Sequence, residues 1–258
     1  MKVLVTGVKG QLGYDVMNEL AKRGYEGVGV DVDEMDITDR AAVERVIGEV
    51  HPDKVVHCAA WTAVDAAEDN QEVCHKVNAE GTENIARICG KLDIPMVYIS
   101  TDYVFDGTNY VPYRETEPTC PNSVYGVTKL AGEKKALEYC SKAMIIRNGM
   151  AVFCIWHNFV KTMIRLGKER ESLGVIFDQI GTPTYARDLA SAVFAAIRKG
   201  IIPGIYHFSN EGVCSWYDFT KSIHRIAGIG NCKVSPLHTD EYPAKAPRPH
   251  YSVLDKTK

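Results

Sequence analysis

The sequence lacks three features that would each assign it to a particular class of protein. None of its eight cysteines forms a Cys-x-x-Cys pair, the spacing typical of zinc and redox sites. Its net charge of −3 disfavours nucleic-acid binding, which usually requires a basic face. No apolar run approaches the roughly 20 residues of a membrane span, and the N-terminus enters a strand with no cleavable signal. We therefore expect a cytoplasmic protein with no metal, nucleic-acid partner or membrane partner, whose cysteines are reduced and mostly buried.

Short apolar segments alternate with helical patterns through the first half of the chain. The apolar segments have the length and composition of buried strands and occupy residues 2–6, 27–31, 54–60 and 94–99. Strands separated by helices of about ten to fifteen residues predict an α/β fold built on a doubly wound parallel sheet of the Rossmann type.

The first of these strands leads into a glycine-rich turn. Three glycines with the spacing Gly-x-x-Gly-x-x-Gly, Gly7, Gly10 and Gly13, separate the strand from a helical pattern. Glycine permits a sharp turn and a close approach of the backbone to a pyrophosphate, and the N-terminus of a helix favours phosphate charge. The turn therefore predicts a dinucleotide site.

An acidic residue, Asp31, ends the second predicted strand. A carboxylate at this separation from the glycines can accept hydrogen bonds from the ribose hydroxyls of NAD and repels the 2′-phosphate of NADP. Lys9, inside the glycine turn, could offset that repulsion. The pattern does not decide between NADH and NADPH as the cofactor.

Tyr125 and Lys129 are four residues apart and share one face if Tyr125 opens a helix. A phenol with a pKa near ~10 is a weak acid at neutral pH, and a neighbouring cation lowers that pKa. The same spacing recurs at Tyr217 and Lys221, so spacing alone is a weak indication. Thr101 distinguishes the first pair, because it ends an apolar strand, where catalytic groups lie in parallel sheets. Together the three side chains could give or take a proton at a carbonyl or alcohol oxygen.

Four polar residues have both a functional and a structural interpretation. His57 lies inside a predicted strand, so we interpret it as a core residue. Asn158 begins a helix that could face a nucleotide or could be a solvated basic helix. Arg187 could bind phosphates, although a salt bridge is the simpler interpretation. Arg248 is a candidate pyrophosphate ligand, because its planar guanidinium suits that group.

Several motifs resemble those of one enzyme family, and they spread over nearly the whole chain. They occupy residues 5–13, 59–65, 100–107, 125–133, 178–185, 215–219 and 248–254. The chain resembles the extended short-chain dehydrogenases/reductases, and more narrowly the dTDP-4-dehydrorhamnose reductase family. That family reduces the C4 ketone of a dTDP-linked 6-deoxy sugar to form dTDP-L-rhamnose, so the resemblance implies NADPH or NADH as cofactor and a dTDP-sugar as substrate.

The resemblance also implies roles for individual residues. Tyr125 would protonate the oxygen that forms when hydride reaches C4, Thr101 would hydrogen-bond that oxygen, and Lys129 would lower the tyrosine pKa and bind the nicotinamide ribose. The cofactor-binding candidates are Gly7, Gly10, Gln11, Leu12, Gly13, Asp31, Asp36, Ala59, Ala60, Thr62, Tyr125 and Lys129. The substrate-binding candidates are Val64, Thr101, Asp102, Tyr103, Asn158, Arg187 and Arg248.

Two features of the sequence bear on the reaction and the substrate. Nucleotide-sugar 4,6-dehydratases of this superfamily typically carry Thr-Asp-Glu, whereas Tyr103 stands in the third position here, which favours simple reduction. Residues 148–157 differ from the usual run, in which a Trp lines the sugar pocket; Met150 stands at the matching position and Trp156 has no assigned role. Two alternative functions therefore remain. One is that of another nucleotide-sugar reductase or epimerase, and the other is that of a non-catalytic, dinucleotide-binding subunit like the regulatory subunit of methionine adenosyltransferase.

We expect two parts in the chain. Residues 1–147 would form the dinucleotide-binding domain, and residues 148–258 mainly a smaller C-terminal substrate-binding lobe, with residues 178–198 returning to the sheet. Family members usually continue beyond the equivalent of Lys258, so we expect this lobe to be shortened. A homodimer is a candidate assembly.

Overall fold

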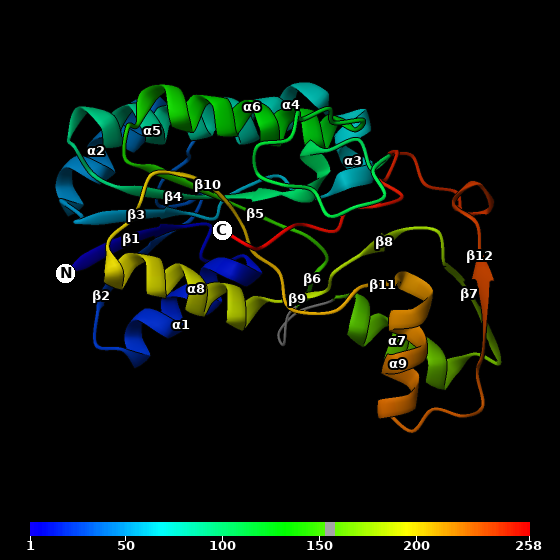
Figure 1. Cartoon of the computed structure of the whole chain (residues 1–258). Helices are drawn as coiled ribbons and strands as arrows, with labels where there is room; N and C mark the ends of the chain where they lie inside the picture. Colours follow the sequence, from blue (N-terminus) through cyan, green and yellow to red (C-terminus); the bar gives the residue numbers. More distant parts are fainter. Residues whose placement is uncertain (153–157) are drawn as a thin grey trace.

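The computed structural model describes residues 1–152 and 158–258, and its centre is a six-stranded sheet whose neighbouring strands are all parallel (Figure 1). The strands are β1 (Lys2–Thr6), β2 (Glu26–Val30), β3 (Lys54–His57), β4 (Met96–Thr101), β5 (Ala143–Asn148) and β10 (Gly204–His207). Their order across the sheet is β2-β1-β3-β4-β5-β10. The chain thus starts inside the sheet and reverses its direction of growth between β1 and β3, which is where ligands bind in folds of this class.

Helices cover both faces of this sheet. The longer ones are α1 (Gln11–Lys22), α2 (Arg40–Val50), α5 (Gly81–Lys91), α6 (Val124–Tyr139) and α8 (Ala186–Lys199). The shorter ones are α3 (Val64–Asp69), α4 (Gln71–His75), the π-helical turn η1 (Lys76–Glu80) and the 3-10 turn η2 (Asp102–Val104). Helices α1 and α8 lie on one face, and α2, α5 and α6 lie on the other (Figure 1). The predicted doubly wound parallel sheet is confirmed.

The alternation of side chains along a strand explains how one sheet supports two helical layers. Val3 and Val5 of β1 are fully buried in the cluster that includes α1 and α8, whereas Leu4 is buried in the cluster that includes α2 and α5. Successive side chains of a strand point to opposite faces, so an uninterrupted apolar run is what a strand covered on both sides requires.

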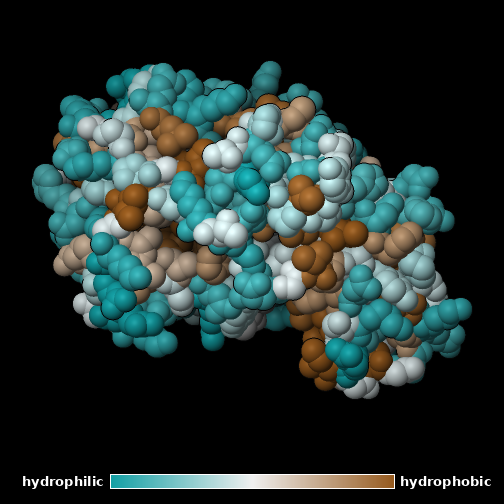
Figure 2. Space-filling model, in the orientation of Figure 1, coloured by the Kyte–Doolittle hydropathy of each residue, from teal (hydrophilic) through white to brown (hydrophobic). Residues whose placement is uncertain are grey.

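A smaller lobe lies beside the carboxyl ends of the central strands (Figure 1). It contains α7 (Phe159–Glu169), β7 (Ser172–Ile176), α9 (Trp216–Ile226) and β12 (Lys233–Leu237). Strands β7 and β12 are parallel, and their side chains form a separate apolar core with those of α7 and α9. Figure 2 shows hydrophobic residues gathered where this lobe meets the rest of the molecule and along its lower edge.

Short strands and the end of the chain connect the two parts. They are β6 (Ala151–Val152), β8 (Ile180–Gly181), β9 (Thr184–Tyr185), β11 (Cys214–Ser215) and the 3-10 turn η3 (Thr239–Glu241). After β9 the chain returns to the sheet through α8 and β10. Residues 248–255, here called the C-terminal strap, run back from the small lobe, and Ser252 N donates to Ile180 O while Tyr113 N donates to Val253 O. The division at residue 147 stays a prediction.

Side chains cap several of the helices that position the site. Asp39 accepts a hydrogen bond from Ala41 N at the start of α2, and Ser123 accepts one from Gly126 N at the start of α6. Asn158 and Ser215 cap α7 and α9 in the same way. Such caps satisfy backbone N–H groups that have no partner inside the helix. Within residues 1–152 and 158–258, none of the helices has both the length and the apolar composition to cross a membrane.

Candidate active site

A cavity of about 910 Å³ opens at the carboxyl ends of the central strands, at the reversal point of the sheet. Its lining includes every residue predicted to bind the cofactor: Gly7, Gly10, Gln11, Leu12, Gly13, Asp31, Asp36, Ala59, Ala60, Thr62, Tyr125 and Lys129. The lining also includes residues that were not predicted to bind the cofactor, among them Ser100 near the end of β4 and Asn148 at the end of β5. The volume falls within the range of ligand and cofactor pockets.

The glycine turn leaves no room for side chains. Gly7 has a φ of 69°, a conformation that favours glycine, and a Cβ there would lie 2.7 Å from the Ala59 backbone. A Cβ on Gly13 would lie 2.3 Å from the Gly7 carbonyl oxygen. Gly10 begins α1 without a side-chain cap, and the first turn of α1 has no acidic residue. A bare helix N-terminus of this kind fits the pyrophosphate of a dinucleotide.

Asp31 makes one end of this cavity acidic, and hydrogen bonds hold its carboxylate in place. Asp31 accepts hydrogen bonds from Lys9 N through Oδ2 and from Val32 N through Oδ1, both at 2.9 Å. The Lys9 ammonium, which the sequence offered as an offset to the repulsion between Asp31 and a 2′-phosphate, forms an ion pair with Asp33. Asp36 accepts from both the backbone N–H and the hydroxyl of Thr38.

The π-helical turn η1 supplies a residue that the sequence did not single out. Asn78 is buried and accepts from Trp61 N at 2.8 Å, while its amide donates to Trp61 O and to the hydroxyl of Thr128 on α6. These bonds join the wall formed by residues 59–62 to the helix that carries Tyr125. Single π-helical turns often occur at functional sites, but they have no sequence pattern that would have revealed this one.

Tyr125 lies in the first turn of α6 with its ring against Tyr103. Burial raises the pKa of the phenol well above its usual range. The Thr101 hydroxyl lowers it, and the nearby Asp102 charge raises it further. The phenol is therefore fully protonated at neutral pH and has a proton to give.

Lys129 lies one turn further along α6, and its lowering of the tyrosine pKa stays a prediction. Its ammonium is buried, donates to Ile99 O at 2.7 Å and lies 4.1 Å from the centre of the Tyr98 ring. Burial lowers the pKa of Lys129 to about 7, and Glu133 opposes that shift. The amine is turned toward the strand end, where the carbonyl of Ile99 accepts its hydrogen bond.

We expect Lys129→Met to stabilise the unliganded protein at neutral pH. Because the folded pKa of about 7 lies below the ordinary 10.5, the unfolded chain binds more protons between these values, and stability rises with pH across that window. Methionine removes both the charge and the pH dependence. Thermal unfolding near pH 7 and near pH 9 measures this; a lower melting temperature at pH 7, or an unchanged difference between the two pH values, would contradict it.

A smaller cavity of about 130 Å³ lies on the other side of Tyr103. Among its lining residues are three predicted substrate ligands, Asp102, Tyr103 and Arg248. Arg248 donates to both carboxylate oxygens of Asp65, at 3.0 and 2.8 Å, so its planar fork is engaged by the protein itself. Burial raises the pKa of Asp102 to about 6, against hydrogen bonds from Ser252 and Thr101 that lower it.

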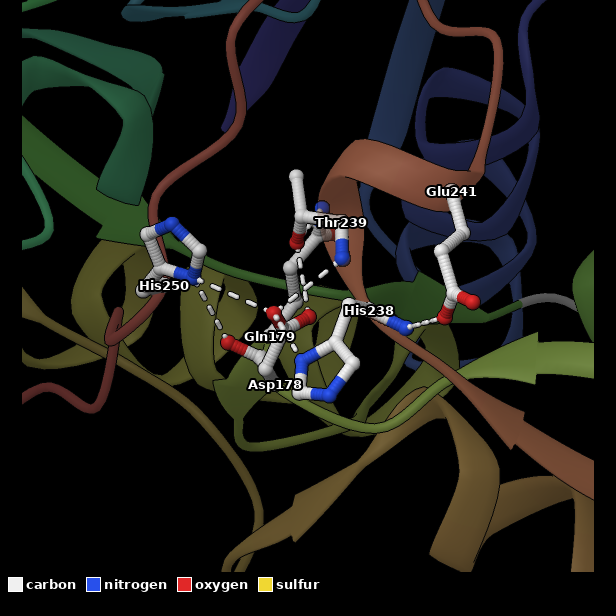
Figure 3. Close-up of polar contacts among 6 residues, drawn as sticks. All are labelled: Asp178, Gln179, His238, Thr239, Glu241 and His250. Carbon is white, nitrogen blue, oxygen red and sulfur yellow. Dashed lines mark hydrogen bonds and ion pairs between the residues drawn. The ribbon is translucent and has the colours of Figure 1, made fainter.

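Asp178 precedes Gln179, a lining residue of the smaller cavity, and holds the polar contacts that Figure 3 shows. Its carboxylate accepts hydrogen bonds from the hydroxyl and backbone N–H of Thr239, at 2.7 and 3.1 Å. The rings of His238 and His250 flank Asp178, and Gln179, which lines the cavity, donates to the Thr239 hydroxyl. These contacts join the start of β8, η3 and the C-terminal strap.

Four predicted substrate residues are not among the lining residues of either cavity: Val64, Thr101, Asn158 and Arg187. Val64 opens α3, and Asn158 caps α7 by accepting a hydrogen bond from Lys161 N. Arg187 is an exposed residue near the start of α8, with Nε 3.9 Å from the carboxylate of Asp15, so its simpler interpretation as a salt bridge fits the structure. Their contact with substrate stays a prediction.

Comparison with known proteins decides the family. The family model described as "RmlD substrate binding domain" matches residues 1–258. A dTDP-4-dehydrorhamnose reductase from Escherichia coli (strain K12) is 39% identical over 100% of this chain and 90% of its own. The chain belongs to the dTDP-4-dehydrorhamnose reductase family.

Two further proteins are similar to this chain over nearly its whole length. The spore coat polysaccharide biosynthesis protein SpsK of Bacillus subtilis (strain 168) is 40% identical over 98% of this chain and 88% of that protein. A crystal structure of dTDP-4-dehydrorhamnose reductase from Bacillus anthracis, in complex with NADP, has a TM-score of 0.96 and 40% identity, covering 99% of this chain and 90% of that one. The resemblance read from the sequence is confirmed.

Gly149, in the run that departs from the usual family sequence, packs against Asp102. A Cβ at this position would lie 2.4 Å from Asp102 Oδ2, so a larger residue would require the carboxylate to shift. Met150 has a φ of 44°, lines the smaller cavity and accepts a hydrogen bond from Thr184 N through its carbonyl. Trp156 lies outside the described residues.

Within the described residues, His57 and most of the cysteines lie where the sequence predicted. His57 is fully buried between the hydroxyls of Thr6 and Thr82, and burial lowers its pKa to about 3, which confirms a core histidine. The cysteines there are free; four are buried, two are partly buried and Cys120 is exposed. These residues contain no group of three or more His, Cys, Asp or Glu side chains placed to hold a metal.

Proposed function

We propose that the protein reduces the C4 ketone of dTDP-4-dehydrorhamnose to give dTDP-L-rhamnose, with NADPH or NADH as reductant. The observation that carries the proposal is the position of Tyr125. Its phenol lines the large cavity, which fits a dinucleotide, and its ring contacts Tyr103, which lines the smaller cavity. A proton donor between a cofactor site and a second pocket is what reduction of a bound ketone requires.

The dinucleotide would lie with its pyrophosphate on the glycine turn and its adenosine ribose at Asp31. When bound it supplies a hydride to the sugar carbon. Tyr125 gives its proton to the oxygen of the reduced carbonyl, and Thr101 hydrogen-bonds the same oxygen. Lys129 holds the nicotinamide ribose, and the dTDP-sugar lies against Asp102 and Tyr103. Relatives with 39 and 40% identity are named as this reductase, and one of them binds NADP.

Two alternatives are less well supported. A 4,6-dehydratase needs an extra acid and base beside the hydroxyl-bearing residue, and Tyr103 stands where such enzymes carry Glu. A purely regulatory, dinucleotide-binding subunit would not need a protonated phenol in the lining of the cofactor pocket. Assembly into a homodimer stays a prediction from the sequence.

The proposal is tested by mixing purified protein with NADPH or NADH and dTDP-4-dehydrorhamnose and following nicotinamide absorbance. A reductase consumes one nicotinamide for each sugar, whereas an epimerase returns its cofactor to the starting state. Stoichiometric consumption with formation of dTDP-L-rhamnose supports the proposal. Sugar conversion without net consumption would contradict it.

Cofactor choice depends on Asp31. We expect Asp31→Ala to weaken the binding of NADH more than that of NADPH, because it removes the acceptor for the ribose hydroxyls and also the repulsion of a 2′-phosphate. Asp31→Asn is the matched variant, since it retains an acceptor oxygen and removes only the charge. It should strengthen NADPH binding and leave NADH binding nearly unchanged. Dissociation constants from fluorescence titration measure both. Equal losses for the two cofactors would mean that Asp31 does not contact the ribose.

A further inference from the structure

Gln179 lines the smaller cavity with only one half of its amide in use. The side chain is 4% exposed, and its nitrogen Nε2 donates to the Thr239 hydroxyl at 3.2 Å. Within residues 1–152 and 158–258 its oxygen Oε1 has no hydrogen-bond partner, yet the protein does not enclose this atom. Buried polar groups normally have a partner. An open acceptor on a buried side chain therefore marks a place where a ligand can donate.

Asp178 and Thr239 set the direction in which this amide points (Figure 3). The Thr239 hydroxyl donates to Asp178 Oδ1 at 2.7 Å, and Thr239 N donates to Oδ2 at 3.1 Å. A hydroxyl has one proton, and here it goes to the carboxylate, the stronger acceptor. The hydroxyl oxygen then accepts from Gln179 Nε2. A reversed amide would place two acceptor oxygens against each other, so Oε1 is the atom left for the cavity.

The surroundings of this amide are rigid on both sides. Burial alone would raise the pKa of Asp178, but hydrogen bonds from Thr239 outweigh it and hold the pKa below its ordinary value. The group is therefore a carboxylate at neutral pH. His250 Nδ1 donates to the Asp178 carbonyl oxygen at 2.9 Å, and Ile180 N donates to His250 O at 2.7 Å. Gln179 thus offers its oxygen in a fixed position before a ligand arrives, which lowers the entropic cost of binding.

The smaller cavity adjoins the group proposed to protonate the substrate. Asp102 and Tyr103 line this cavity and directly follow Thr101 in the sequence. The rings of Tyr103 and Tyr125 have centres 5.5 Å apart. The volume of about 130 Å³ is below the usual range for a pocket that holds a whole ligand, so the cavity fits one part of the substrate. A sugar whose C4 oxygen lies at Tyr125 would direct its neighbouring ring carbons there.

We propose that Gln179 accepts a hydrogen bond from a ring hydroxyl of the sugar, at C2 or C3, and that Thr239 is the positioning residue that orients the amide. This inference rests on the proposed function. It makes Gln179 a specificity-determining residue, because a sugar without that hydroxyl would cover Oε1 and leave it without a donor. Sites built to hydrogen-bond a hydroxyl reject analogues that lack it for this reason.

The test combines a change in the protein with a change in the ligand. Dissociation constants would be measured by calorimetry, with the oxidised cofactor present, for dTDP, dTDP-L-rhamnose and its 2-deoxy and 3-deoxy sugar derivatives. The wild type should bind one of the two derivatives more weakly than dTDP-L-rhamnose by roughly 5- to 50-fold. Gln179→Met should weaken dTDP-L-rhamnose by a similar factor and bind that derivative equally well, with dTDP affinity unchanged.

The other outcomes are equally definite. The role of Gln179 is overturned if the wild type binds both derivatives as tightly as dTDP-L-rhamnose, or if Gln179→Met still discriminates between them. It is also overturned if the variant weakens dTDP as much as dTDP-L-rhamnose, since the contact would then be with the nucleotide. A parallel assay of dTDP-4-dehydrorhamnose reduction separates the two proposals. Wild-type turnover without discrimination overturns only the role of Gln179, whereas absence of turnover overturns the proposed function and this inference with it.

Gln71→Met is the matched control for the substitution. Gln71 begins α4 and is exposed, so this variant should bind all four ligands as the wild type does; the same loss there would overturn the assignment to Gln179.

Thr239 provides a second test, which also applies if Gln179→Met does not fold. Thr239→Val removes the oxygen that accepts from Nε2, so the amide loses its fixed direction, whereas Thr239→Ser keeps it. We expect Thr239→Val to weaken dTDP-L-rhamnose but not dTDP, and Thr239→Ser to bind both as the wild type does. Equal affinities for dTDP-L-rhamnose in the two variants would overturn the positioning role of Thr239.

Discussion

Replacing Tyr125 by Phe should lower kcat by roughly 10²- to 10⁴-fold, the range that a positioned proton donor contributes, while dinucleotide affinity stays nearly unchanged. The substitution removes one hydroxyl, whereas the ring, its contact with Tyr103 and the glycine turn all remain. Steady-state rates and fluorescence titration with NADPH measure the two effects separately.

Tyr217→Phe is the matched control, because Tyr217 belongs to the second Tyr-x-x-x-Lys copy in the chain. It lies on α9, where it packs beside the core of the small lobe. This variant should turn over at the wild-type rate. If Tyr125→Phe retained substantial turnover, or if both variants lost it equally, Tyr125 would not be the proton donor.

The second large effect is expected at a buried ion pair beneath the site. Glu133 of α6 accepts hydrogen bonds from Arg147 Nε at 2.9 Å and Nη2 at 2.6 Å, and both side chains are almost inaccessible. Ser100, next to Thr101, donates to the same carboxylate. Glu133→Ala leaves the arginine buried and unpaired, so we expect the free energy of unfolding to fall by about 3–5 kcal/mol.

Urea denaturation measures this loss, and an exposed pair provides the control. Arg165 and Glu169 form an ion pair on the surface of α7 with side chains more than half exposed. Pairs of this kind contribute about 0–1 kcal/mol, so Glu169→Ala should change stability little. Similar small losses in both variants would mean that the Glu133 pair does not hold α6 to the sheet.

The sequence predicted the features that depend on local chemistry. The glycine turn must accept a positive φ at Gly7 and close backbone contact at Gly13, and only glycine does both without strain. The strands were visible because a sheet covered on both faces needs continuous apolar runs. The cofactor residues follow from these two features, since the turn and the strand ends fix where the cavity lies.

Other features depend on contacts between distant segments, which no local pattern contains. Asn78 joins the cavity wall to α6 only because a π-helical turn places it beside Trp61 and Thr128. Arg248 was predicted to bind pyrophosphate from its chemistry alone, whereas the fold pairs it with Asp65. Lys129 shares a helix face with Tyr125, as predicted, but the carbonyl of Ile99 attracts its ammonium. The burial that sets the pKa values of these groups is likewise a tertiary property.

Isotope transfer tests the central claim most directly. The protein would be incubated with dTDP-4-dehydrorhamnose and NADPH or NADH carrying deuterium at the transferable position of the nicotinamide, and the product would be examined by NMR. We predict dTDP-L-rhamnose with one deuterium at C4, formed by the wild type and strongly reduced with Tyr125→Phe. A product without deuterium at C4, or deuterium at another carbon, would contradict reduction of the C4 ketone at this site.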